Sequence, residues 1–237
     1  YFVGDAPALL VVDPLAKKVY CSRMMPMNGM GDMMPQSEST LIQSLYYSSM
    51  GLSEGISYQI NSPAPHGLAI NSDGSEVYVA SNTADWLWKI SIVDGTVKGS
   101  VMDENIGNTP DIAAQRLKPL QIVSAADSLL FVTCSGGIWY NPFTGDQDTI
   151  PGQVQLWNSN SMKLVDTYDF EWYSTPWHIV QSPVDNTVCV TLAGDITFTQ
   201  NNAILSSGVA CLNYESNSIN EKAILYSESF EILHGID

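Results

Sequence analysis

The chain has 237 residues, and its 25 acidic and 9 basic side chains give a formal net charge of −16 at pH 7. Proteins bind phosphate backbones through clusters of lysine and arginine, and the sequence has no such cluster, so it argues against a nucleic-acid partner. No run of about 18 apolar residues is present, and the sequence therefore predicts no membrane-spanning segment.

The first predicted unit, residues 2–60, consists of short strands separated by turns and one long insertion. Apolar runs place its strands at residues 8–12, 19–22, 40–45 and 55–60, with the insertion at residues 23–39. A four-stranded sheet of this kind cannot bury both of its faces alone, so it has to stack on further copies of itself.

The second predicted unit, residues 65–101, is the most compact. Its strands are expected at residues 65–70, 77–80, 86–92 and 97–101. Asp73-Gly74 and Asp94-Gly95 lie between strands, and both dipeptides tolerate the positive φ values of tight turns. We therefore expect an antiparallel sheet without helices.

Two more units follow a connection at residues 102–118. The third, residues 119–168, has expected strands at 120–124, 129–133, 154–157 and 164–168, with an insertion at 135–151. The fourth, residues 176–226, has expected strands at 177–181, 187–192, 209–212 and 223–226, with an insertion at 193–207. A fifth copy is expected to begin near residue 233.

Prolines at positions 7, 65, 119 and 176 mark the start of the four copies, at intervals of about 55 residues. Four-stranded units at this period are typical of a β-propeller, whose units are called blades. We expect an all-β propeller of four-stranded antiparallel blades, with four blades and the start of a fifth in this sequence and about seven in the complete protein. Residues 1–237 are interpreted as a single, incomplete propeller domain.

The second unit shows the repeat most clearly, as Pro65-His66-Gly67, then Asp73-Gly74, then the run from Val77 to Asn82. This pattern resembles the YVTN/NHL-type propeller repeat, and the likeness covers nearly the whole chain. It is also similar to the propellers of surface-layer proteins, of nitrous oxide reductase and of lactonases. The resemblance implies the fold, whereas the function stays open because propellers carry many unrelated activities.

In an antiparallel blade, the start of the first strand and the end of the second strand lie on one face of the propeller. The long insertions and the connections between blades therefore emerge on that face, and the tight turns on the other. Since binding residues concentrate on long loops of rigid scaffolds, we expect the face with the long loops to be functional.

All three histidines, His66, His178 and His234, lie at the starts of predicted first strands, close to the propeller channel. Imidazole is the commonest metal ligand in proteins. In the propeller of nitrous oxide reductase, histidines in similar Pro-His-Gly settings contribute to a copper cluster, although that cluster needs more histidines than this sequence has. The alternative is a structural turn in which each imidazole bonds to backbone.

Six of the nine methionines lie in the first insertion: Met24, Met25, Met27, Met30, Met33 and Met34. Thioethers are soft ligands that suit Cu(I), so copper is a candidate cofactor for these methionines and the histidines. The same flexible, apolar side chains also suit an adaptable protein contact. Both interpretations remain open at this point.

Other candidates lie on the same predicted face. The acidic side chains of Asp103, Glu104, Asp111, Asp146 and Asp148 could bind a hard cation such as calcium or simply be solvated. The pairs Trp139-Tyr140 and Trp172-Tyr173 could stack on a sugar, contact a partner, or pack within loops.

The four cysteines, Cys21, Cys134, Cys189 and Cys211, show no CxxC spacing, which argues against zinc ribbons and CxxCH haem attachment. Cys189 and Cys211 fall in neighbouring strands, where either a disulfide or two buried thiols would fit. Low lysine content and turns rich in Asn, Ser and Thr favour an extracytoplasmic protein, in the periplasm or at the cell surface.

The main functional expectation is a non-catalytic scaffold that presents its long loops to a protein partner or a surface assembly. The first alternative is a copper-binding or redox-associated propeller, and the second is a lactonase-like enzyme. An enzyme ranks lowest because no acid–base cluster stands out in the sequence. No residue is assigned as catalytic or as a ligand of an organic cofactor.

Overall fold

The structure is a computed structural model, and it describes residues 7–23, 40–106, 116–125, 128–141, 144–171, 174–194 and 207–226. The chain divides into two compact units, Tyr1–Ala114 and Gln115–Asp237, and each is described by itself. That the whole chain forms one propeller domain stays a prediction.

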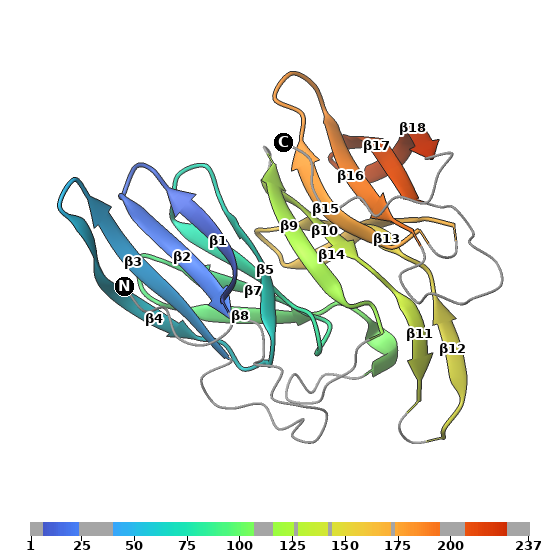
Figure 1. The fold of residues 1–237 in the computed structure, drawn as a ribbon, viewed down its shortest axis with the longest axis horizontal. Coiled ribbons are helices and arrows are strands. Elements are labelled where there is room, and N and C mark those ends of the chain that lie inside the picture. The colour runs from blue at the N-terminus through green and yellow to red at the C-terminus, as the bar shows by residue number, and fades with distance from the viewer. Residues whose placement is uncertain are drawn as a thin grey trace. The chain divides into compact units, whose positions relative to one another are not determined.

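The first unit contains two antiparallel sheets of four strands, each in simple chain order (Figure 1). One sheet consists of β1 (Pro7–Asp13), β2 (Lys18–Arg23), β3 (Leu41–Ser48) and β4 (Gly51–Gln59). The other consists of β5 (Pro65–Ile70), β6 (Glu76–Ser81), β7 (Trp86–Ser91) and β8 (Val97–Val101), and a single 3-10 turn, η3 (Glu104–Ile106), follows it.

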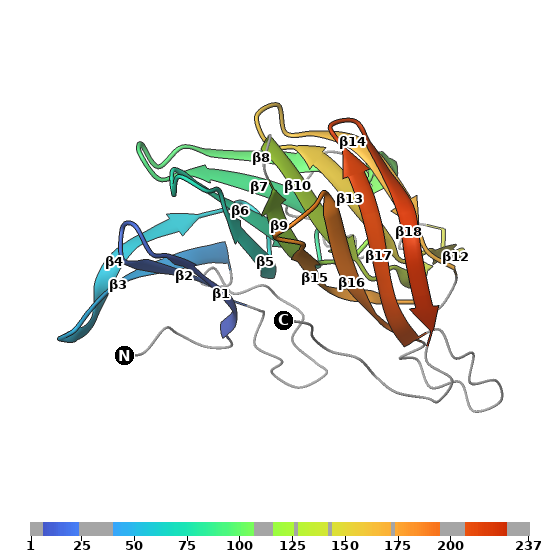
Figure 2. The same cartoon turned by 90° about the horizontal axis from the view of Figure 1, so that it is seen from above.

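The second unit also contains two four-stranded antiparallel sheets. In one, β9 (Pro119–Ala125), β10 (Leu129–Cys134), β13 (Gln153–Asn158) and β14 (Lys163–Asp169) lie in that order. In the other, β15 (Pro176–Gln181), β16 (Thr187–Ala193), β17 (Ser207–Glu215) and β18 (Ser218–Tyr226) lie side by side (Figure 2). A separate two-stranded hairpin, β11 (Gly137–Tyr140) and β12 (Gln147–Ile150), interrupts the first of them between β10 and β13.

The all-β architecture of antiparallel four-stranded sheets confirms the sequence prediction. The strand limits differ most in the first sheet, where the strands expected at 40–45 and 55–60 are β3 and β4, which are longer and joined by a tight turn. The sequence did not predict the β11–β12 hairpin, because residues 135–151 were interpreted as an irregular insertion. The number of blades in the complete protein and ring closure remain predictions.

Each unit has its own hydrophobic core, formed where its two sheets stack. In the first unit, Tyr20 and Ile42 of one sheet pack with Val77, Val79 and Ile90 of the other, and all five are fully buried. Such strands are apolar on nearly every residue because both faces of a stacked sheet are covered.

The core of the second unit is built in the same way. Phe131 and Leu156 of the β9–β14 sheet pack with Val188, Val190 and Leu212 of the β15–β18 sheet. Alternate residues of a strand point to opposite faces of its sheet. The face of β16 that carries Val188, Val190 and Leu192 therefore points into this core. The residues between them, including Cys189, belong to the opposite face.

Candidate active site

The histidines lie where the sequence placed them, at the starts of first strands, but in different units. His66 is the second residue of β5, and its carbonyl oxygen accepts a hydrogen bond from the Ser22 hydroxyl at 2.6 Å. His178 is the third residue of β15, and its backbone N–H donates to Thr191 Oγ1 at 3.1 Å. His234 and the six methionines of the first insertion lie outside the described residues.

No group of three or more His, Cys, Asp or Glu side chains within the described ranges is placed to hold a metal ion. Copper and calcium therefore find no support in that part of the chain. Of the acidic candidates, Asp103 accepts a hydrogen bond from the Asn105 backbone, and Asp148 forms an ion pair with Arg116. Asp111, Trp172 and Tyr173 lie outside the described residues.

Charged and aromatic side chains that could bind or activate a substrate come together at the β11–β12 hairpin. β10 runs antiparallel to β9, so it ends where β9 begins, and the hairpin follows directly from that end (Figure 1). This is the position where the sequence predicted the functional loops, at the start of a first strand.

Local sequence explains why the hairpin forms. Gly136 and Gly137 both have positive φ, 61° and 109°, which lets the chain turn sharply out of β10. At the other end, Asn141 N–H donates to the Asp146 carbonyl at 2.8 Å, and Gly145 N–H donates to the Asn141 carbonyl at 2.8 Å. The loop is thereby closed by its own backbone, and four residue pairs hold β11 against β12.

Arg116 anchors this hairpin to the segment that precedes β9. Its Nη1 donates to Asp148 Oδ2 at 3.1 Å, and its guanidinium carbon lies 4.6 Å from the centre of the Trp139 ring. Trp139 and Asp148 are cross-strand partners, so their side chains share one face of the hairpin. The Arg116 side chain is only 13% exposed, whereas that of Asp148 is 54% exposed and remains open to a ligand.

Lys118 brings a second positive charge to the same face. A Cβ atom on Gly137 would lie 3.3 Å from Lys118 Nζ, so the ammonium group lies against Gly137, which is two positions from Trp139 on the same face of β11. Lys118 has a positive φ of 53° and precedes Pro119. Its carbonyl accepts the Ser135 N–H at 3.2 Å, which fixes this strained backbone against the end of β10.

Left-handed backbone before the proline is a repeated feature of the sheets, since Ala64 and Thr175 share it with φ values of 49° and 43°. Each precedes the proline that begins a first strand. Non-glycine residues rarely adopt this conformation and are found there when their surroundings hold them. This repeated backbone conformation therefore fixes the position of the Lys118 backbone. Of the three residues, only Lys118 carries a charged side chain.

We call Arg116, Lys118, Trp139 and Asp148 the hairpin cluster. It combines two cations, one exposed carboxylate and an aromatic wall on one face of a two-stranded ribbon. Such an arrangement suits a polar ring compound, because cations stabilise negative oxygen atoms and a carboxylate accepts hydrogen bonds or a proton.

The sequence analysis identified Trp139 and Asp148 separately, as an aromatic candidate and a cation ligand, and it missed Arg116 and Lys118. A single arginine and a single lysine in a loop match no motif. One signal was available: Arg116 is one of only two arginines in the chain, and it stands three residues before the repeated proline.

No family model and no curated protein matches this sequence. Solved structures do match. A Bacteroides uniformis protein named as a 6-phosphogluconolactonase is 11% identical, with a TM-score of 0.60 over 93% of this chain and 57% of its own. A Bacteroides fragilis protein of the same name is 12% identical, with a TM-score of 0.58 over 93% of this chain and 55% of its own. The periplasmic gluconolactonase of Pseudomonas aeruginosa is 15% identical, with a TM-score of 0.64 over 95% of this chain and 59% of its own.

These comparisons support a fold of the lactonase propeller type, and this chain spans somewhat more than half the length of each neighbour. They do not confirm the YVTN/NHL-type assignment. They also correct our main functional expectation. The non-catalytic scaffold was wrong, because the neighbours are named as lactonases and thereby favour the enzyme that we had ranked last. The judgement that an enzyme was improbable was wrong for the same reason.

In the part of the chain that the structure describes, no helix is both long and apolar enough to cross a membrane.

Proposed function

We propose that this chain is part of a lactonase-type enzyme that hydrolyses the ring ester of a sugar lactone, with the hairpin cluster as its binding and catalytic site. The observation that carries the proposal is the Arg116 guanidinium, held between Trp139 and the exposed Asp148 carboxylate. The names of the structural neighbours point to the same class of substrate.

The chemistry of ring opening matches the cluster. Water attacks the lactone carbonyl carbon, the carbonyl oxygen becomes negative, and the ring C–O bond then breaks to leave a carboxylate and a hydroxyl group. In our proposal Asp148 accepts the proton of the attacking water as general base. Arg116 and Lys118 stabilise the negative oxygen, which is the role of preorganised donors in acyl transfer. Trp139 holds the guanidinium plane in place.

The proposal predicts that Arg116→Gln and Asp148→Asn lose lactonase activity. Loss of an oxyanion donor lowers kcat by about 10²–10³-fold, and loss of a general base by about 10²–10⁴-fold. Hydrolysis of D-glucono-1,5-lactone releases an acid, so a pH-stat measures the rate after subtraction of spontaneous hydrolysis.

Lys222→Gln is the matched control, because it removes a surface ion pair of the same unit, Lys222 Nζ to Asp185 Oδ2 at 2.9 Å, far along the chain from the hairpin. It is expected to keep the wild-type rate. Equal rates for all three variants, or a wild-type rate no faster than the spontaneous reaction, would contradict the proposal.

We also propose an extracytoplasmic location, a YVTN/NHL-type repeat and about seven blades in the complete protein. The disulfide between Cys189 and Cys211 supports the location, because structural disulfides persist in oxidising compartments. The periplasmic gluconolactonase is a neighbour from such a compartment. Cell fractionation followed by immunodetection tests the location: the protein is expected in the periplasmic or surface fraction, and its recovery with the cytoplasmic fraction would contradict the proposal.

A further inference from the structure

The hairpin cluster is assembled from two halves that different segments of the chain carry. Arg116 and Lys118 precede β9, whereas Trp139 and Asp148 lie on the β11–β12 hairpin. The first half is fixed to the end of β10 through the backbone, because the Ser135 N–H donates to the Lys118 carbonyl at 3.2 Å. Whether the cluster is complete therefore depends on how the hairpin is held.

The backbone fixes the base of the hairpin as far as Gly136. The Gly136 N–H donates to the Leu117 carbonyl at 2.9 Å, and a Cβ atom on Gly136 would collide with the Ile150 carbonyl oxygen. From Gly137 onward, β11 pairs with β12 alone among the described strands. Gly137 has a φ of 109°, and glycine permits backbone rotations that other residues do not. Gly137 is therefore the first residue at which the hairpin can turn.

Beyond its base the hairpin has little core of its own. Figure 1 shows β11 and β12 extending beyond the end of β10. In β12, residues 147–149 are exposed and the last residue, Ile150, is buried. Tyr140, the last residue of β11, is 63% exposed. A two-stranded hairpin alone is marginally stable in water, so side-chain contacts have to hold this one in position.

Arg116 makes those contacts from the fixed half. It reaches Asp148 Oδ2 with Nη1 at 3.1 Å and lies 4.6 Å from the centre of the Trp139 ring. The Asp148 side chain is 54% exposed, and exposed ion pairs are weak because water and salt screen them. A cation–π contact near the surface is weak as well. The two contacts together therefore act as a latch that opens without unfolding of the sheet.

We propose that residues 138–140 of β11 and 147–149 of β12 form a flap, hinged at Gly137 and latched by Arg116. In the closed state Asp148 lies beside the two cations, and in the open state the general base is separated from the oxyanion donors. The flap opens to admit the lactone and closes to complete the hairpin cluster, as lids of other enzymes do. A lactone that contacts both halves favours the closed state. The role of the lactone rests on the proposed function, whereas the hinge does not.

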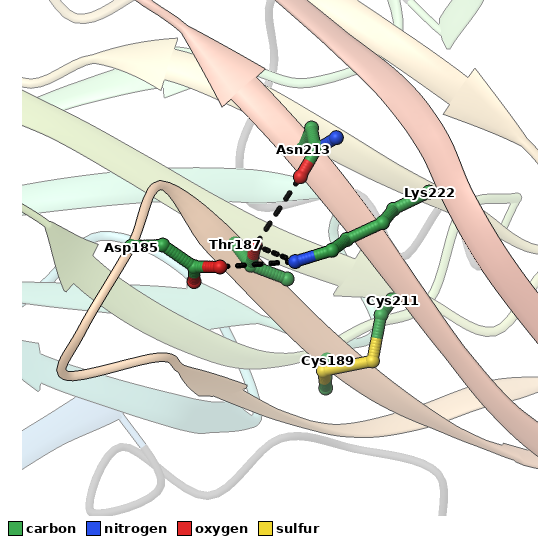
Figure 3. Close-up of a disulfide and its surroundings, with 6 residues drawn as sticks. All are labelled: Asp185, Thr187, Cys189, Cys211, Asn213 and Lys222. Atoms are coloured by element: carbon green, nitrogen blue, oxygen red, sulfur yellow. Dashed lines mark hydrogen bonds and ion pairs between the residues drawn. A yellow bond between two sulfur atoms is a disulfide. The ribbon is translucent and has the colours of Figure 1, made fainter.

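The test measures the distance between two nitroxide labels on the full chain by double electron–electron resonance. One label is attached to Tyr140→Cys in the flap and the other to Lys163→Cys, an exposed position at the start of β14. Two native cysteines are buried and the other two are joined in a disulfide, so the labels react with the introduced thiols (Figure 3). We expect two distances, a major one for the closed flap and a minor one for the open flap.

Arg116→Gln removes the latch. The ratio of open to closed flap is expected to rise by about 5- to 30-fold, as for the loss of one exposed ion pair and one cation–π contact. About 1 M NaCl should raise the ratio in the parent protein, because salt screens exposed charges. Lys222→Gln is the matched control, since it removes the ion pair with Asp185 in the same unit (Figure 3). The control is expected to leave the ratio unchanged.

A single distance that neither Arg116→Gln nor salt alters would overturn the proposal, because the hairpin would then be fixed. An equal shift in Lys222→Gln would also overturn it, because the loosening would not come from the latch. Saturating D-gluconolactam is expected to reduce the open fraction. Opening in a protein that neither hydrolyses the lactone nor responds to the lactam would support the hinge and contradict the proposed function. Lactonase activity with a fixed hairpin would contradict the hinge alone.

Discussion

Two hydroxyl side chains, Ser22 and Thr133, make the same pair of hydrogen bonds in two different units. Each accepts a backbone N–H from the first strand of its own sheet, Leu9 at 3.2 Å and Gln121 at 3.2 Å. Each also donates to a backbone carbonyl of the next sheet, His66 or Trp177, which lies 44 residues further along the chain. The hydroxyl group of Ser22 or Thr133 therefore links its own sheet to the next sheet through hydrogen bonds.

Thr133→Val tests this role. Valine has the shape of threonine, so the change leaves the Gln121 N–H and the Trp177 carbonyl without their partner, and buried unpaired groups cost about 1–3 kcal/mol. The free energy of unfolding, from urea titrations followed by circular dichroism, is expected to fall by that amount. Thr133→Ser, which keeps the hydroxyl, should lose much less, and equal losses in the two variants would argue against the hydrogen bonds.

Turn carboxylates give the protein part of its pH dependence. Hydrogen bonds from Ser182, Lys222 and Thr187, together with the Lys222 charge, lower the pKa of Asp185 from its ordinary value of 3.8 to about 2. Because the folded-state pKa lies below the unfolded-state value, the stabilisation is complete above about pH 4 and is lost as the pH falls through about 2.

Asp185→Asn is therefore expected to lower Tm at pH 7 and to have the same Tm as the wild type near pH 2. Differential scanning calorimetry at the two pH values checks this, and a Tm difference that is unchanged at pH 2 would contradict the assignment. Asp94, whose pKa is also lowered to about 2 through hydrogen bonds with Ser91 and Thr96, provides a second carboxylate of the same kind.

At the scale of elements, the sheets could be predicted because their strands are apolar on both faces and end at turn residues. β5 and β6, for example, follow from the apolar run at residues 65–70, the Val-Tyr-Val-Ala run and the Asp73-Gly74 turn between them. The β11–β12 hairpin could not be predicted in this way, since both strands are only four residues long and β12 is mostly exposed and polar. Strands of that length carry too few alternations to separate them from a loop.

The hairpin cluster shows the same limit of sequence reasoning. Trp139 and Asp148 are nine residues apart in the sequence and face each other only because the hairpin pairs them. Arg116 is 32 residues from Asp148, and nothing in its neighbours indicates the ion pair. The proximity of Cys189 and Cys211 was easier to predict, because the two cysteines fall in consecutive strands of one sheet and the strand register alone could bring them together. The sequence still left open whether they form a disulfide.

For the whole molecule, the charge distribution bears directly on the proposed substrate. The chain carries a net charge of −16 with only 9 basic residues, so its surface repels anions in general. Two of those basic residues, Arg116 and Lys118, lie on one face of the hairpin. This local concentration of positive charge makes the hairpin cluster the place where a sugar acid or a developing oxyanion would be stabilised.

The central claim, that the hairpin cluster binds a sugar lactone, is tested most directly by the ¹H–¹⁵N NMR spectrum of the protein titrated with D-gluconolactam, a ring analogue that resists hydrolysis. The account predicts shift changes that saturate and that are confined to residues 116–118 and 137–150, and their loss in Asp148→Asn. Saturable changes elsewhere in the chain, or no changes at millimolar lactam, would contradict it.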